Sequence, residues 1–105
     1  MSKPAWQPPS DIDEECVNIC RAINSHYGFY TIESCCGHGE DRFAVFAKVH
    51  DLAALPFLLA PIKKNGWICE VAMSESHDTP TFWLRSINKG RVAYDEANTI
   101  ALELT

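Results

Sequence analysis

The stretch Glu33-Ser34-Cys35-Cys36-Gly37-His38-Gly39 decides the fold prediction, because it marks the point where a strand runs into a turn. Before it, residues 29–36 are rich in the aromatic and β-branched side chains that are typical of strands. After the turn at 37–41, residues 42–50 have a similar composition. Two such segments joined by a short loop with glycines predict a β-hairpin. A thiol pair, an imidazole and two glycines mark the end of its first strand and its turn.

A helix is predicted on the N-terminal side of this hairpin. Ser10 stands three positions before Asp13, as in a capping box. Apolar residues then follow at helical spacing, and Gly28 marks the expected end. The stripe consists of Ile12, Cys16, Ile19, Cys20 and Ile23. Residues 1–10 contain three prolines and lack the apolar core of a signal peptide, so we expect an extended arm there.

The second half of the chain repeats the alternation of helix and hairpin. Asp51 is placed to cap a helix over 52–64, and strands are predicted over 67–74 and 81–87. A last helix is predicted over 91–104, where apolar residues share one face: Ala93, Ala97, Ile100, Ala101 and Leu104. The order αββαββα over residues 11–105 predicts a single α+β domain. We expect a two-layer sandwich with a four-stranded, mainly antiparallel sheet and helices on one face.

Strand alternation assigns each residue of the sheet to one of two faces. The face expected to lie under the helices carries Ile32, Ser34, Cys36, Phe43, Val45, Ala47, Val49, Trp67, Cys69, Val71, Met73, Phe82 and Leu84. The opposite face carries Glu33, Cys35, Ala44, Phe46, Lys48, Ile68, Glu70, Ala72, Trp83, Arg85 and Ile87. An apolar patch on an open face predicts an interface, so we expect a homo-oligomer or partner contact through Phe46, Trp83 and Arg85. Cover by the N-terminal arm with Trp6, or a ligand floor, are the alternatives.

Composition narrows the classes of function. A net charge of −5 argues against a protein that binds the nucleic-acid backbone. No apolar run approaches the roughly 18 residues of a membrane span. Five cysteines are an odd number, and no export signal accompanies them, which favours reduced thiols and a cytoplasmic location.

The loop at 34–39 is first predicted to bind a small anionic or nucleotide-like ligand. Glycines permit a backbone in which successive N–H groups point inward and form an anion-binding nest. The Ser34 hydroxyl and the His38 imidazole add polar groups to it. The expected binding residues are Ser34, Cys35, Cys36, Gly37, His38 and Gly39.

Chemistry at the thiols and a purely structural role are the alternatives for the same loop. Zinc would use Cys35, Cys36 and His38, with Cys69, His50 or His77 as the fourth ligand. Adjacent strand residues face opposite ways, however, so the leading expectation is that the protein has no metal cofactor.

A thiol enzyme would use Cys35 or Cys36 as the nucleophile and His38 or His50 as the base, oriented by Glu33, Glu40 or Asp41. Alternation favours Cys35 and His38 as the catalytic candidates. In the structural role, the segment is a tight hairpin turn with a buried thiol.

The segment Tyr30-Thr31-Ile32-Glu33-Ser34-Cys35-Cys36-Gly37-His38-Gly39, followed by an apolar strand, resembles a small family of bacteriophage and prophage proteins. The stretch Asp51-Leu52-x-x-Leu55-Pro56, the Trp67 strand and the pair Ala93-Tyr94 are also similar to that family. The resemblance implies a phage-type accessory protein in the bacterial host cell. It brings no activity with it.

A more distant resemblance is to the wybutosine-synthesising methyltransferase-like family, which has a Ser-Cys-Ser-Gly-Arg strand end implicated in cofactor or substrate binding. Ser34, Cys35 and Gly37 match that pattern, whereas Cys36 replaces its second serine and His38 replaces its arginine. The resemblance therefore implies a binding loop more than methyl transfer.

Overall fold

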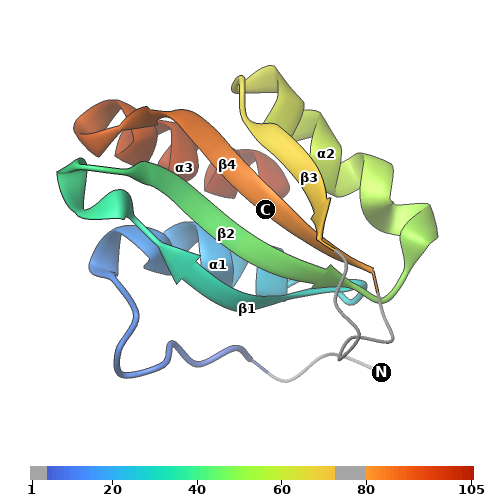
Figure 1. Ribbon diagram of the computed structural model, residues 1–105. Coiled ribbons are helices and arrows are strands. Elements are labelled where there is room, and N and C mark those ends of the chain that lie inside the picture. The colour runs from blue at the N-terminus through green and yellow to red at the C-terminus, as the bar shows by residue number, and fades with distance from the viewer. Residues whose placement is uncertain (1–4, 73–79) are drawn as a thin grey trace.

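The computed structural model describes residues 5–72 and 80–105 and confirms the predicted α+β, two-layer architecture (Figure 1). Its helices and strands are α1 (Val17–Asn24), β1 (Phe29–Cys35), β2 (Arg42–Val49), α2 (Leu55–Lys64), β3 (Ile68–Ala72), β4 (Thr81–Lys89) and α3 (Gly90–Leu104). The sheet order is β1-β2-β4-β3, and each strand is antiparallel to its neighbours. All three helices lie against the same face of the sheet.

The hydrophobic core lies between the helices and this face. The predicted inward positions of β2, which are Phe43, Val45, Ala47 and Val49, are at most 1% exposed. From the helical layer, Ile19 and Ile23 of α1 and Ile100 of α3 are completely buried. Cys16 and Cys20 are also buried, as the helical stripe predicted. The alternation of apolar residues thus placed the centre of the core correctly.

The N-terminal end of the first helix differs from the prediction. Ser10 does not cap it; instead a 3-10 turn begins at Glu14 and leads into α1. Asp13 occupies the cap position, but its side chain caps no helical N–H group. Its carboxylate accepts a hydrogen bond from Cys36 instead. At the second helix the prediction is confirmed, since the Asp51 carboxylate accepts a hydrogen bond from the Ala53 N–H at 3.1 Å.

A shift in register interrupts strand β1 between Thr31 and Glu33. Thr31 pairs with Ala47 and Ser34 pairs with Val45, so Ile32 is the extra residue, and it is 40% exposed instead of buried as predicted. Asn24, at the end of α1, explains the position of the irregularity. Its side chain donates to the Thr31 hydroxyl at 2.8 Å and accepts from the Thr31 N–H at 3.1 Å. That backbone group is therefore satisfied by a helix side chain.

The edge strand β3 is less buried than predicted. Val71 pairs with Phe82 and so faces the helical side, yet it is 62% exposed because it lies at the free edge of the sheet. Met73 and most of the predicted 75–80 loop lie outside the described residues. Strand β4 extends to Lys89, and α3 begins directly at Gly90, whose φ of +62° makes the sharp change of direction.

The described helices leave the opposite face of the sheet uncovered, and we call it the open face (Figure 1). The N-terminal arm does not place Trp6 there: its side chain packs against the core and, with Thr31 and Ile32, lines a small cavity along β1. Within the described part of the chain, no helix is both long enough and apolar enough to cross a membrane.

Candidate functional site

The Gly37–Gly39 turn has an uncommon backbone. Cys36 has right-handed helical angles, and the next three residues all have positive φ: +81° at Gly37, +53° at His38 and +79° at Gly39. The Gly37 carbonyl closes the turn by accepting from the N–H groups of Glu40 and Asp41, at 3.0 and 2.9 Å. Glycine tolerates this region freely, whereas a residue with a Cβ is disfavoured there by about 1–2 kcal/mol. The sequence Gly-His-Gly therefore confines the strain to His38.

The N–H groups expected to hold an external anion are bonded within the chain. Cys36 N–H donates to Asp13 Oδ2 at 3.0 Å, and Gly37 N–H donates to the sulfur of Cys35 at 3.4 Å. His38 N–H donates to the sulfur of Cys36 at 3.4 Å. Of these three N–H groups, only that of Cys36 donates to the Asp13 carboxylate, and the other two donate to cysteine sulfurs.

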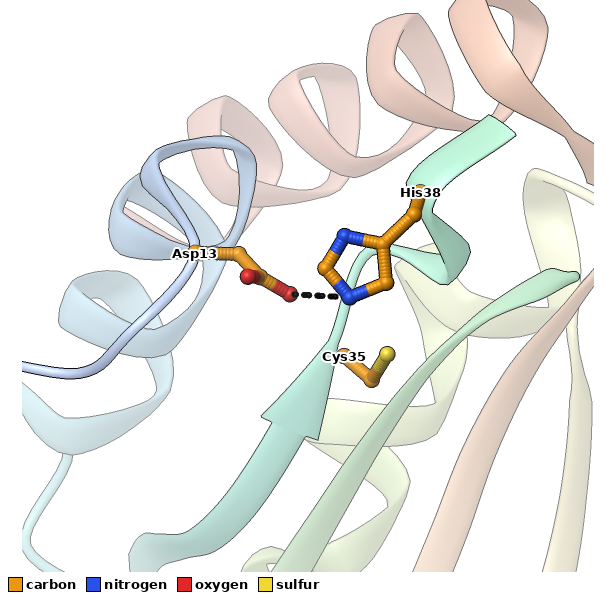
Figure 2. Close-up of side chains that lie close together, drawn as sticks. All are labelled: Asp13, Cys35 and His38. Carbon is orange, nitrogen blue, oxygen red and sulfur yellow. Dashed lines mark ion pairs between the residues drawn. The ribbon is translucent and has the colours of Figure 1, made fainter. Parts of the chain in front are cut away.

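Three potential metal ligands converge beside this turn (Figure 2). Asp13 approaches from the segment before α1, Cys35 from the end of β1 and His38 from the turn. Their ligand atoms all lie within 4.8 Å of one another, and His38 Nε2 is 3.9 Å from Asp13 Oδ2. This metal-ligand cluster is the only group of three or more such residues in the described ranges 5–72 and 80–105.

Accessibility and packing differ across the cluster. The His38 side chain is 67% exposed and that of Asp13 is 24% exposed, and Cys35 is exposed as well. The imidazole can therefore move toward an incoming ligand, while Asp13 is fixed by its bond from Cys36 N–H. Because the cluster is exposed, one side of it is open to solvent or to a further ligand.

Cys36 supports the cluster from the buried side. Its sulfur lies 3.7 Å from His38 Nδ1 and 4.0 Å from the Tyr94 hydroxyl of α3. Burial raises the pKa of the Cys36 thiol, although the bond from His38 N–H acts in the opposite direction. The thiol therefore stays protonated at neutral pH. Its sulfur can accept a hydrogen bond from Nδ1–H, and the other ring nitrogen, Nε2, lies 3.9 Å from Asp13 Oδ2 and forms an ion pair with it when the imidazole is protonated (Figure 2).

The structure separates the two adjacent cysteines as alternation predicted. Cys36 is 2% exposed and belongs to the core, whereas Cys35 is exposed and its partner across the sheet is Ala44, on the open face. Ser34 pairs with the buried Val45, and its hydroxyl lowers the pKa of the Cys16 and Cys20 thiols, against the larger effect of their burial. It is therefore not part of the exposed cluster.

The other predicted ligands and orienting groups are absent from the cluster. His50 stacks on Tyr30 with ring centroids 4.8 Å apart, and Cys69 lies on the edge strand β3. His77 lies outside the described residues. Glu33, Glu40 and Asp41 do not join the cluster either. Asp13 is the third member of the cluster instead, and the sequence indicated only a helix-capping role for it.

The predicted interface residues lie together on the open face, and none of them belongs to the metal-ligand cluster. Phe46 and Trp83 pair across β2 and β4 and stack with centroids 4.5 Å apart and ring planes 11° from parallel. The Arg85 guanidinium lies 5.1 Å from the Trp83 ring and 3.6 Å from a carboxylate oxygen of Glu70. The homo-oligomer that this patch suggested stays a prediction.

Comparison with known proteins finds no match to a family model, to a curated protein or to a solved structure. The bacteriophage and methyltransferase-like resemblances therefore stay predictions.

Proposed function

We propose that this protein binds a thiophilic divalent metal ion, with zinc the expected one, through Asp13 Oδ2, Cys35 Sγ and His38 Nε2. The observation that carries the proposal is that one ligand atom of each residue lies within 4.8 Å of the other two, although the residues come from three separate segments of the chain. Thiolate, imidazole and carboxylate are the ligand types that zinc uses in proteins.

The distances support a site that closes on the ion. Zinc bonds of about 2.0–2.2 Å to nitrogen and oxygen at tetrahedral angles place these two ligand atoms about 3.3–3.5 Å apart. The distance of 3.9 Å between His38 Nε2 and Asp13 Oδ2 exceeds that separation by a few tenths of an ångström. Rotation of the exposed His38 side chain supplies this change, since the backbone of the turn is held by its own hydrogen bonds.

The surroundings of two ligands match those of metal sites. A ligating histidine usually donates its second ring N–H to a neighbouring acceptor, which fixes its tautomer. Here the sulfur of Cys36 lies 3.7 Å from His38 Nδ1 and is positioned to accept that proton. A ligating carboxylate is usually hydrogen-bonded in turn, and Asp13 Oδ2 accepts from Cys36 N–H at 3.0 Å.

Three protein ligands leave the fourth zinc position for water or another molecule. A small anionic ligand, the first prediction for this loop, would reach the site through that position, because the backbone N–H groups already have acceptors. In this proposal, the predicted anion therefore binds to the metal ion at the fourth position. In this proposal the protein is a metal-binding module with an exchangeable position.

Titration of the metal-free protein with Co²⁺ and Zn²⁺ tests the proposal. We expect one equivalent of Co²⁺ to give thiolate-to-cobalt absorption, and Zn²⁺ to displace it. Cys35→Ser should abolish that absorption, and His38→Asn should weaken binding at least about tenfold. Asparagine is chosen because it tolerates positive φ. Cys69→Ser and His50→Asn are the matched controls and should bind like wild type. Unchanged binding by Cys35→Ser would refute the site.

A further inference from the structure

The small cavity that Trp6 helps to line lies between the N-terminal arm and strand β1. It has a volume of about 180 Å³ and is lined by Trp6, Pro9, Asp11 and Ile12 of the arm and by residues 31–34 of the strand. Pockets for drug-sized ligands measure roughly 300–1,000 Å³, so this cavity suits a molecule of only a few non-hydrogen atoms. None of its lining residues belongs to the metal-ligand cluster.

The walls of the cavity combine apolar surface with negative charge. Trp6, Ile12 and Ile32 supply an aromatic ring and two branched aliphatic side chains. Asp11 of the arm and Glu33 of β1 are the acidic lining residues, and both are exposed. Among residues 5–72 and 80–105, no lysine, arginine or histidine lines the cavity.

This chemistry selects organic cations. An aromatic face attracts an ammonium group by about 0.5–1 kcal/mol at exposed sites and more when water is excluded. Two carboxylates of like charge near one cavity repel each other, and a cation between them removes that repulsion. An anion would meet both carboxylates, and a neutral molecule would gain only the apolar contact.

We propose that this cavity binds a small organic ammonium ion, with its alkyl body against Trp6, Ile12 and Ile32 and its charged nitrogen near Asp11 and Glu33. The inference does not rest on the metal ion, because its residues are different ones. It does give the N-terminal arm a role, since the arm contributes one carboxylate and the aromatic wall.

The probe for this proposal is tert-butylammonium, and tert-butanol is its neutral counterpart of nearly equal shape. The readout is the indole N–H resonance of each tryptophan in a nitrogen-15 spectrum. We expect tert-butylammonium to shift the Trp6 signal with millimolar affinity, while the buried Trp67 and the open-face Trp83 stay unmoved. Sodium chloride at equal ionic strength should have no such effect.

Variants separate charge recognition from apolar contact. Asp11→Asn and Glu33→Gln together should raise the dissociation constant at least about tenfold, and Trp6→Leu about threefold. Glu40→Gln, which removes an exposed charge outside the cavity, and Cys35→Ser, which removes a metal ligand, should bind like wild type. The proposal is overturned if tert-butanol shifts Trp6 equally, if the double variant keeps wild-type affinity, or if no probe shifts Trp6.

Discussion

Asp13 and Cys36 lie 23 positions apart in the chain, yet the carboxylate of one accepts a hydrogen bond from the backbone N–H of the other at 3.0 Å. This contact ties the segment before α1 to the end of the first strand of the hairpin. It also satisfies the N–H group at the start of a turn whose three residues have positive φ. One carboxylate oxygen thus stabilises the turn and faces His38 Nε2.

The first prediction concerns this shared role of Asp13. Asp13→Ala removes the acceptor of a part-buried N–H group and should lower the free energy of unfolding by about 1–3 kcal/mol. Asp13→Asn retains a side-chain oxygen and should cost less than half as much, while still weakening zinc binding. Urea denaturation measures the stability, and cobalt titration measures the affinity. Equal losses of stability in the two variants would contradict the proposed hydrogen bond.

The second prediction compares the two glycines of the turn. At Gly37 a Cβ would lie 3.2 Å from the backbone carbon and oxygen of Arg42, and φ is +81°. At Gly39 φ is +79°, but nothing lies within 4 Å of a Cβ. Gly39→Ala should therefore cost only the conformational term, about 1–2 kcal/mol. Gly37→Ala should cost clearly more, because the contact is with backbone that cannot move aside. Chemical denaturation of both variants measures the difference, and equal costs would show that the Arg42 contact is unimportant.

The sequence predicted most of the architecture because the dominant signals are local and periodic. The alternation of apolar residues over 43–49 predicted which side chains of β2 face the helices, and the helical spacing of apolar residues predicted the buried face of α3. Both signals reflect burial on one side of an element. Neither depends on which distant segment provides the cover.

Features set by single distant contacts could not be predicted in this way. Ile32 lies outside the core because the Asn24 side chain bonds to Thr31 and the register of β1 changes there. Asp13 joins Cys35 and His38 only because the fold brings the start of α1 beside the end of β1. No spacing rule relates an acid before a helix to a turn after the next strand. The sequence therefore predicted two members of the cluster and missed the third.

The third prediction concerns Glu96, which links the far end of the sheet to α3. Its carboxylate accepts from Trp67 Nε1 at 3.1 Å, from the Ser86 hydroxyl at 2.6 Å and from Asn88 Nδ2 at 2.9 Å. Glu96→Ala leaves these three donors without their acceptor and should destabilise the protein by about 3 kcal/mol. Asp95→Ala changes the exposed neighbouring position and should stay within about 0.5 kcal/mol of wild type. Thermal and urea unfolding of both variants measure this contrast, and similar losses would contradict it.

The fourth prediction is alkaline destabilisation through the buried thiols. Burial raises the pKa of Cys16 from its ordinary value of 9.0 to about 12, and burial also raises the pKa of Cys20. The folded protein then holds more protons than the unfolded chain above pH 9. The stability from this source is complete below pH 9 and is lost as the pH rises toward 12. Cys16 should contribute a slope of about 1.4 kcal/mol per pH unit in that window.

Cys16→Val tests this assignment, because valine fills a similar volume without an ionisable group. The free energy of unfolding of the metal-free variant should be measured from pH 8 upward. It should fall less steeply with pH than that of wild type, and the two slopes should differ by the contribution of the Cys16 thiol. An unchanged slope would show that Cys16 does not ionise on unfolding in this range.

The last prediction uses the reactivity of the cysteines to report on the metal site. Cys35 is exposed and should react with iodoacetamide in the native metal-free protein, whereas Cys16 and Cys20 are at most 1% exposed and should react only after unfolding. Half-buried Cys69 is an internal reference on another strand. Bound zinc occupies the sulfur of a ligating thiolate and should slow the alkylation of Cys35 at least about tenfold, without changing that of Cys69. Peptide mapping by mass spectrometry measures each rate. Equal protection of both thiols would indicate a general change in stability, and protection of neither would contradict coordination by Cys35.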